Sequence, residues 1–116
     1  MYMYEYQKKS LIERYNESQR IQLKYPDRIP VIIERDKNSK APPLLKSKYL
    51  VPKDITISQL IYAIRRQIKL DPQYALYFFI SDNIPPTSAS IQNMYNQYKE
   101  TDGFLYIMYT LENTFG

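Results

Sequence analysis

The sequence predicts an α+β fold in which helices form one layer on a mixed sheet. Runs rich in β-branched and aromatic residues at positions 30–35, 48–51, 76–80 and 104–109 are typical of strands. Apolar residues at helical spacing lie before the first run and in the intervals that follow the second and the third. The 116 residues, 44% hydrophobic and 24% charged, are enough for a single ordered domain.

A first helix is expected from residue 10 to about residue 24, after a shorter helical turn at residues 4–8. Ser10 and Glu13 match a capping box, in which each side chain satisfies an exposed backbone N–H. Pro26 ends the helix, because proline disfavours the helical state of the residue before it. The predicted inward face is formed by Leu11, Tyr15 and Ser18, flanked by Ile12 and Ile21.

The first two strands and the second helix follow. Pro30 begins the strand at residues 30–35, where no ladder N–H is lost, and Pro52 closes the strand at residues 48–51. Thr56 or Ser58 caps the next helix. Its apolar stripe consists of Leu60, Ile61, Ile64 and Ile68.

The second half of the chain repeats the alternation of strand and helix. Residues 76–80 are expected to form a buried central strand, and Ser88 or Ser90 opens a short helix after a Pro-rich loop. Asp102-Gly103 is a turn before the last strand. This order predicts a ubiquitin-like β-grasp at residues 26–110, with an N-terminal helical extension (1–25) and a flexible C-terminal tail (111–116), all in one domain.

Charge is unevenly distributed along the chain. Residues 1–70 hold 15 basic and seven acidic residues, whereas residues 71–116 hold one basic and five acidic residues. Two interpretations stay open: an ordinary surface of mixed charge, or a basic face that attracts acidic peptides, anionic lipid or nucleic acid.

The composition argues against an enzyme. The chain contains no His and no Cys, so a general base would have to be Asp, Glu or Lys. No Gly-rich phosphate loop or thiolate metal site is present, and we expect neither a cofactor nor a metal. No signal peptide or long apolar run is visible, so the encoded chain is expected to be soluble.

The chain ends in Gly116, one of only two glycines. A terminal glycine carboxylate is unhindered, because glycine lacks a Cβ, and can enter the narrow active site of another enzyme. The glycine is therefore a candidate reactive group whose chemistry belongs to partner enzymes.

Several segments, in order and at matching spacing, resemble the GABARAP-type autophagy ubiquitin-like modifiers. They are Arg28-Ile29-Pro30-Val31, Lys48-Tyr49-Leu50-Val51-Pro52, Asp102-Gly103-Phe104-Leu105-Tyr106 and Glu112-Asn113-Thr114-Phe115-Gly116, together with residues 59–66 and 83–87. The resemblance covers residues 13–116. Residues 1–9 depart from it, because that family commonly opens with an aromatic residue and a proline.

The resemblance implies conjugation. Activating and conjugating enzymes would carry Gly116 as a thioester and join it to the amino group of phosphatidylethanolamine, with Phe115 as the recognition residue. A cysteine protease would process and deconjugate the chain. The expected location is the cytoplasm and, after lipidation, the autophagosomal membrane.

The resemblance also implies docking of cargo receptors through short aromatic-x-x-aliphatic motifs. The strand at residues 48–51 would be an edge strand that receives the peptide. The aromatic pocket would comprise Glu17, Ile21, Pro30, Ile32, Lys48, Leu50 and Phe104. The aliphatic pocket would comprise Tyr49, Val51, Pro52, Ile55, Leu60 and Ala63. Arg28, Lys46 and Lys48 would meet acidic residues of the peptide.

Three further alternatives are weighed against this reading. Residues 77–80 could receive helical ligands, although a buried central strand is favoured there. The chain could be a ubiquitin-like module that docks peptides without being conjugated. Its positive charge and 13 tyrosines could also bind nucleic acid, which is less favoured and would weaken steeply with salt.

Overall fold

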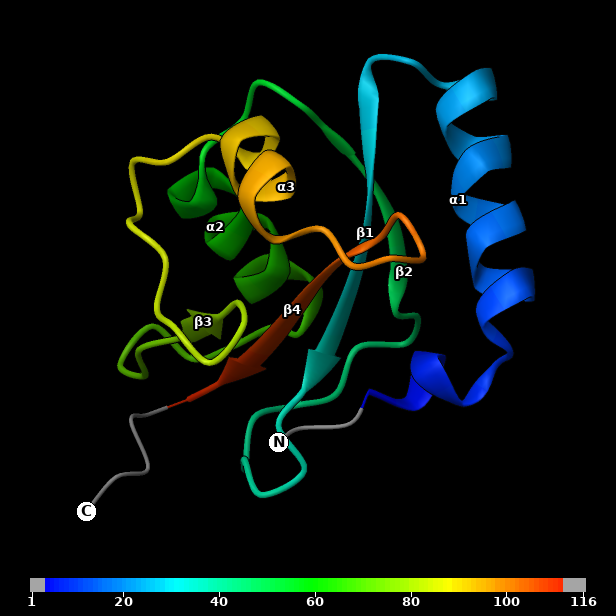
Figure 1. Cartoon of the computed structure of the whole chain (residues 1–116). Helices are drawn as coiled ribbons and strands as arrows, with labels where there is room; N and C mark the ends of the chain where they lie inside the picture. The colour runs from blue at the N-terminus through cyan, green and yellow to red at the C-terminus, as the bar shows by residue number, and fades with distance from the viewer. Residues whose placement is uncertain (1–3, 112–116) are drawn as a thin grey trace.

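The computed structural model describes residues 4–111 and contains the predicted elements in the predicted order (Figure 1). They are the 3-10 helix η1 (Glu5–Lys8), α1 (Leu11–Lys24), β1 (Arg28–Arg35), β2 (Lys48–Pro52), α2 (Ile57–Gln67), β3 (Tyr77–Phe79), α3 (Ile91–Tyr98) and β4 (Leu105–Thr110). Thr56 caps α2 through a capping box with Gln59, and Ser90 caps α3 by accepting the Asn93 N–H. The prediction thereby narrows to one capping residue for each helix.

The four strands form one mixed sheet in the order β2-β1-β4-β3. β1 and β4 are parallel and central, while β2 and β3 are antiparallel edge strands. The prediction that residues 76–80 form a central strand was therefore wrong. Phe78 is buried, but Tyr77 and Phe79 are only half-buried, whereas β4 lies between β1 and β3 and is buried along most of its length.

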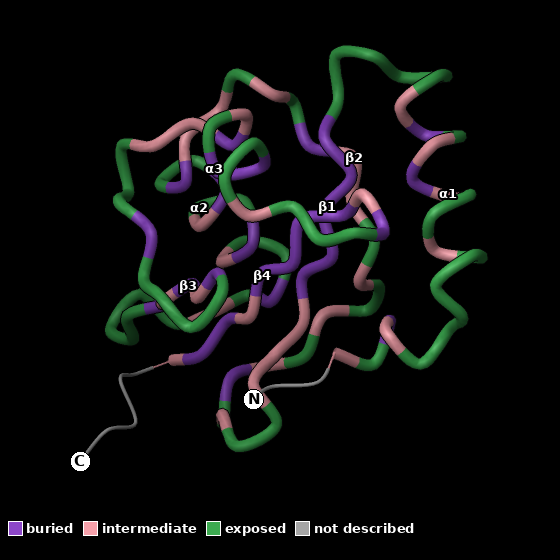
Figure 2. Tube along the Cα trace, in the orientation of Figure 1, coloured by how far each residue is buried: buried purple, intermediate pink, exposed green. Residues whose placement is uncertain are grey.

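Helices lie on both faces of the sheet (Figures 1 and 2). α2 and α3 bury apolar side chains against Val31, Ile33 and Ile107 in the main core, which forms the predicted helical layer. α1 and η1 lie on the other face, where a second cluster comprises Tyr6, Ile21, Ile32, Phe104 and Tyr106, with Tyr4 and Leu50 packed against it. We call this second cluster the aromatic cluster. The N-terminal extension thus adds a layer to the predicted one.

The 3-10 helix η1 is fixed by one side chain from the sheet. The two carboxylate oxygens of Glu34 accept the backbone N–H groups of Glu5 and Tyr6, at 2.7 and 2.9 Å. The rings of Tyr4 and Tyr106 lie 4.9 Å apart between centroids, and those of Tyr6 and Phe104 lie 5.1 Å apart. The start of the described chain is therefore packed on the sheet by both polar and aromatic contacts.

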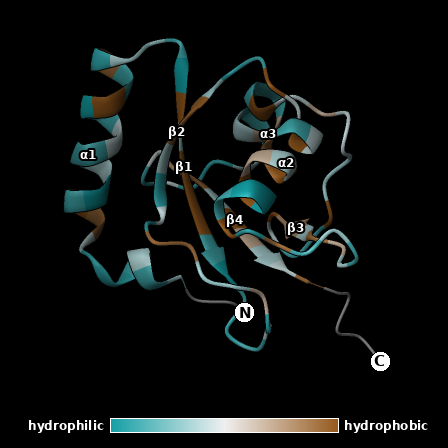
Figure 3. Ribbon diagram, turned by 180° about the vertical axis from the view of Figure 1, so that it is seen from behind, coloured by the Kyte–Doolittle hydropathy of each residue, from teal (hydrophilic) through white to brown (hydrophobic). Residues whose placement is uncertain are grey.

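The inward face of α1 is mostly polar, and the predicted apolar face was wrong. Leu11, Ile12 and Tyr15 are 52%, 69% and 47% exposed, and only Ser18 and Ile21 of the predicted set are buried. Figure 3 shows most of α1 in hydrophilic colours. Ser10 caps the helix as predicted, by accepting the Glu13 N–H. Packing of α1 must therefore depend on groups that a search for apolar periodicity does not find.

Those groups converge on the turn before β4. Asp102 is fully buried. Its carboxylate accepts hydrogen bonds from Nη1 of Arg14 at 2.6 Å, from Oη of Tyr106 at 2.5 Å and from the N–H of Phe104 at 2.9 Å. Ser18 Oγ donates to the Asp102 carbonyl oxygen at 2.5 Å. Arg14 and Ser18 are one helical turn apart, so they present one polar stripe to the turn.

Gly103 lets α1 approach this turn closely. Its φ of +87° lies in the left-handed region, which favours glycine. A Cβ built at this position would overlap Ser18 Oγ. Tyr95 Oη donates to the Gly103 carbonyl oxygen at 2.7 Å and accepts Nε2 of Gln22 at 2.7 Å. The turn is thus bonded to both α1 and α3.

Gly103→Ala is expected to lower the free energy of unfolding by roughly 2–4 kcal/mol, because it combines left-handed strain with overlap against Ser18. Chemical denaturation of Gly103→Ala, Ser18→Ala and the double variant measures the coupling. We expect the double variant to be more stable than the sum of the single effects predicts, because Ser18→Ala removes the overlapping oxygen. Strict additivity would contradict the close approach of α1.

Candidate peptide-docking edge

The outer edge of β2 carries free backbone groups. Within residues 4–111, β2 pairs only with β1, and Ile33 N–H donates to the Ser47 carbonyl oxygen at 2.8 Å. In an antiparallel ladder, hydrogen-bonded and non-bonded pairs alternate. The register therefore makes Val31 with Tyr49 a bonded pair and Pro30 with Leu50 a non-bonded one.

By the same parity, the N–H and C=O groups of Lys48 and Leu50 point away from β1. β1 begins at Arg28 and not at Pro30 as predicted, so Pro30 lies inside the strand. The pairing pattern accommodates a residue that has no backbone N–H. At this position β2 requires no N–H from Pro30, and pairing with β4 begins only at Val31. The Leu50 carbonyl is reached by Nη1 of Arg28 at 3.3 Å, an exposed bond that an incoming N–H could replace.

The two faces of β2 belong to different hydrophobic clusters. Leu50 packs against the aromatic cluster beside α1, whereas Val51 lies in the main core and Tyr49 packs against it. This agrees with the alternation of side chains along a strand. One edge strand is therefore flanked by two separate apolar surfaces.

The residues predicted for the aromatic pocket are brought together beneath Leu50. Ile21, Ile32 and Phe104 are almost completely buried and form the floor, and Pro30 is buried too. Lys48 and Glu17 lie at the rim, with Nζ and Oε1 3.6 Å apart. Because Leu50 is only half-buried, its outer side is available to a ligand.

At the rim, the Glu17 carboxylate is paired with both Arg20 and Lys48 in the free chain. Burial raises the pKa of the Glu17 carboxyl, but its hydrogen bond to Arg20 and the charges of Lys48 and Arg20 outweigh burial and lower the pKa overall. Lys48 is exposed, so its ion pair with Glu17 contributes little to stability. The Lys48 ammonium can therefore exchange this partner for an acidic residue of a ligand.

The second predicted pocket is only partly assembled from the predicted residues. Val51 and Leu60 are buried in the main core, and Tyr49 and Ile55 are half-buried against it. Burial raises the pKa of the Tyr49 phenol, whose Oη donates to the Lys46 carbonyl at 3.1 Å.

Two predicted members of that pocket stand apart. Ala63 is exposed on α2. Pro52 is exposed at the end of β2, where strand alternation puts it on the same side as Lys48 and Leu50. Lys46 is exposed beside the pocket, and its Nζ lies 5.1 Å from the centroid of the Tyr49 ring.

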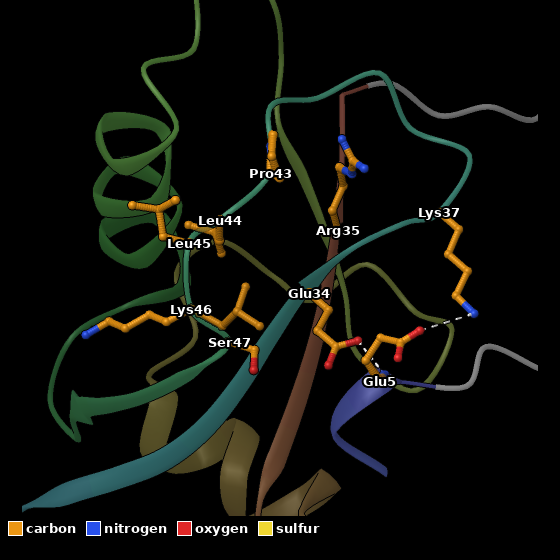
Figure 4. A pocket seen from close by; sticks show the side chains of 10 residues that line it. Glu5, Glu34, Arg35, Lys37, Pro43, Leu44, Leu45, Lys46 and Ser47 are labelled. Atoms are coloured by element: carbon orange, nitrogen blue, oxygen red, sulfur yellow. Dashed lines mark hydrogen bonds and ion pairs between the residues drawn. The ribbon is translucent and has the colours of Figure 1, made fainter. Parts of the chain in front are cut away.

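A cavity of about 420 Å³ lies just before β2 and was not found by sequence reasoning (Figure 4). Ile33 and Leu44 supply apolar lining. Charges of both signs also line it, from Arg35, Lys37 and Lys46 and from Glu5 and Glu34. Leu45 also lines it and is fully exposed. The available signal was an apolar pair, Leu44-Leu45, between prolines and a lysine in a segment interpreted only as a connection.

The C-terminal tail begins beside the sheet. The Leu111 N–H donates to Ser39 Oγ at 3.3 Å, and the Leu111 side chain packs against the main core. Phe115 and Gly116 lie outside the described residues. Among residues 4–111, no helix is long and apolar enough to cross a membrane.

A family model described as autophagy protein Atg8 ubiquitin like matches residues 13–116. The chain belongs to the Atg8 family. It is accordingly an autophagy ubiquitin-like modifier, and the match begins at the residue where the predicted resemblance begins.

Similar Atg8-family proteins come from distant organisms. Autophagy-related protein 8 of Schizosaccharomyces pombe is 51% identical over 107 residues, which are 92% of this chain and 88% of that protein. Autophagy-related protein 8d of Arabidopsis thaliana is 48% identical over 106 residues, 91% of this chain and 88% of that protein. The crystal structure of Trypanosoma brucei ATG8 aligns with a TM-score of 0.92 at 34% identity, covering 99% of this chain and 100% of that one. The predicted ubiquitin-like fold is confirmed.

Proposed function

We propose that this Atg8-family chain is of the GABARAP type and is joined through the Gly116 carboxyl to the amino group of phosphatidylethanolamine. Activating and conjugating enzymes of the autophagy pathway form the amide, a cysteine protease processes and releases the chain, and Phe115 is the side chain that these enzymes hold. The conjugate resides on the autophagosomal membrane and the free chain in the cytoplasm. Family membership over residues 13–116 supports the conjugation, since that span includes both tail residues.

The position of the tail suits such a linkage. Leu111 is held at the end of β4, and the five residues that follow it end in Gly116. Five extended residues reach about 17 Å, enough for the carboxylate to enter an active site while the folded domain stays outside it. The two acyl chains of the lipid then give stable anchoring.

A chain that ends at Phe115 is expected to form no lipid adduct, because it lacks the glycine carboxylate. The measurement is intact mass after incubation with the activating and conjugating enzymes, ATP and phosphatidylethanolamine vesicles. Thr114→Ala, which keeps Gly116, is the matched control and should gain the mass of one phosphatidylethanolamine less one water, which amide formation releases. Lipid on the shortened chain at the level of the control would contradict the assignment.

The second part of the proposal is docking of an extended peptide along β2. Residues i and i+3 of a strand point to opposite faces. The two apolar surfaces beside β2 also lie on opposite faces, one at Leu50 and one at Val51. The match between the spacing of the two peptide anchors and the opposite positions of the two apolar surfaces is the observation that best supports an aromatic-x-x-aliphatic ligand from a cargo receptor.

Each anchor of the peptide would replace solvent over one cluster. The aromatic side chain packs on Leu50 above Ile21 and Phe104, and the aliphatic one packs beside Tyr49 and Leu60. The peptide backbone pairs with the free groups of Lys48 and Leu50. Arg28, Lys46 and Lys48, all exposed, attract acidic flanking residues and mainly raise the association rate.

Leu50→Ala is expected to weaken binding of an aromatic-x-x-aliphatic peptide by about tenfold or more, because it removes apolar contact under the aromatic anchor. Isothermal titration measures the effect. Leu70→Ala is the matched control. Leu70 is also half-buried but packs against the main core, so this variant should bind the peptide normally.

A peptide with one residue fewer between its anchors tests whether the two anchors must point to opposite faces of the added strand. Both anchors then point to the same face, so the intact chain should bind this peptide far more weakly. Equal affinity for the two spacings, or an undiminished affinity of folded Leu50→Ala, would contradict the proposed docking mode.

A further inference from the structure

The C-terminal tail leaves the sheet at a point where a side chain from another segment holds it. β1 pairs with β4 as far as Tyr109, and β3 pairs with β4 as far as Thr110. Leu111 therefore follows the last strand pair. Its backbone N–H donates to Ser39 Oγ at 3.3 Å, and its side chain packs against the main core. Ser39 thus holds the first residue after the sheet.

Ser39 belongs to a compact turn between β1 and β2. Its backbone N–H donates to the Asp36 carbonyl oxygen at 3.0 Å, and the Asn38 N–H donates to the Asp36 carboxylate at 3.2 Å. The Ala41 N–H donates to Ser39 Oγ at 3.1 Å. A hydroxyl oxygen has two lone pairs, so this one oxygen accepts N–H groups from both Ala41 and Leu111. The turn therefore fixes the oxygen to which the tail bonds.

The sheet and the main core hold this turn in place. Asp36 N–H donates to the Tyr109 carbonyl oxygen at 2.9 Å, and Tyr109 Oη donates to the Pro42 carbonyl oxygen at 2.8 Å. Nη1 of Arg35 donates to the Ala41 carbonyl oxygen at 2.7 Å, and Ala41 is buried in the main core. The turn is thus bonded to both β1 and β4, which makes it a firm support for the start of the tail.

We propose that Ser39 is a positioning residue for conjugation, because its hydroxyl fixes where the tail begins and in which direction it leaves the domain. This inference rests on the proposed conjugation through Gly116. Five residues follow Leu111, and the activating enzyme must order them to bring the Gly116 carboxylate into its active site. Each residue that has to be ordered costs conformational entropy. With Leu111 already held, the enzyme has one residue fewer to order.

The contribution of Ser39 belongs to substrate binding and not to the chemical step. The whole tail separates Ser39 from Gly116, so the hydroxyl acts through Leu111 and does not touch the reacting atoms. Order that exists before binding lowers the entropy lost when the tail enters the active site. An effect of this kind is equal in the bound substrate and in the transition state, so its loss raises KM and leaves kcat unchanged.

The test is the steady-state rate of thioester formation by the activating enzyme with ATP, measured against the concentration of this chain. Ser39→Ala is expected to raise KM about threefold or more at unchanged kcat, because the Leu111 N–H loses its acceptor. Ser39→Thr keeps a hydroxyl and should restore the KM of the unsubstituted chain. Ser88→Ala, which removes an exposed serine before α3, is the matched control and should change neither constant. An unchanged KM in folded Ser39→Ala would overturn the proposal.

Amide hydrogen exchange reports whether the hydroxyl acts on the tail. In Ser39→Ala the amides of Ala41 and Leu111 should exchange about threefold or more faster, while those of β1 and β4 change little. The variant should also bind the aromatic-x-x-aliphatic peptide with unchanged affinity, which shows that the fold is intact. A raised KM without faster exchange at Leu111 would contradict a role through the tail.

The conjugation and the positioning role fail in different ways. If the folded, unsubstituted chain forms no thioester, the proposed conjugation is wrong and the role of Ser39 falls with it. If that chain forms the thioester and Ser39→Ala does so with the same KM, the positioning role alone is wrong.

Discussion

The placement of the first helix depends on a buried carboxylate. Asp102 has no exposed surface, and it bonds Arg14 from α1, Tyr106 from β4 and the backbone of its own turn. Removing one partner of such a buried ion pair commonly costs about 3–5 kcal/mol. Since α1 supplies Ile21 and Glu17 to the surface beside β2, this polar contact also positions the aromatic pocket.

The rest of the site follows from sheet order. β2 is an edge strand with helices on both sides of the sheet, so its alternate side chains join different clusters. The same alternation turns the N–H and C=O groups of Lys48 and Leu50 away from β1. In the proposed docking mode, the alternation of β2 therefore sets the spacing of the two peptide anchors, the outward direction of the Lys48 and Leu50 backbone groups and the separation of the two apolar surfaces.

Sequence reasoning predicted what local chemistry controls. The cap of α1 at Ser10, the order of the strands along the chain and the alternation along residues 48–51 were visible in the residue pattern, and the caps of α2 and α3 were limited to two candidates each. The inner face of α1 was not, because its stripe is polar and bonds a turn some 80 residues away. The edge position of β3 was not either, because a short apolar strand has the same pattern at an edge and at the centre. The cavity before β2 requires η1, β1 and residues 43–47, which only the tertiary structure brings together.

The central claim is that a peptide ligand extends the sheet at β2. Amide hydrogen exchange of the chain with and without an aromatic-x-x-aliphatic peptide tests it most directly. Lys48 and Leu50, whose N–H groups face outward, should gain protection of about tenfold or more at saturating peptide. Tyr49 and Val51 already donate to β1 and should change much less. Binding that leaves the Lys48 and Leu50 amides unprotected would contradict the account.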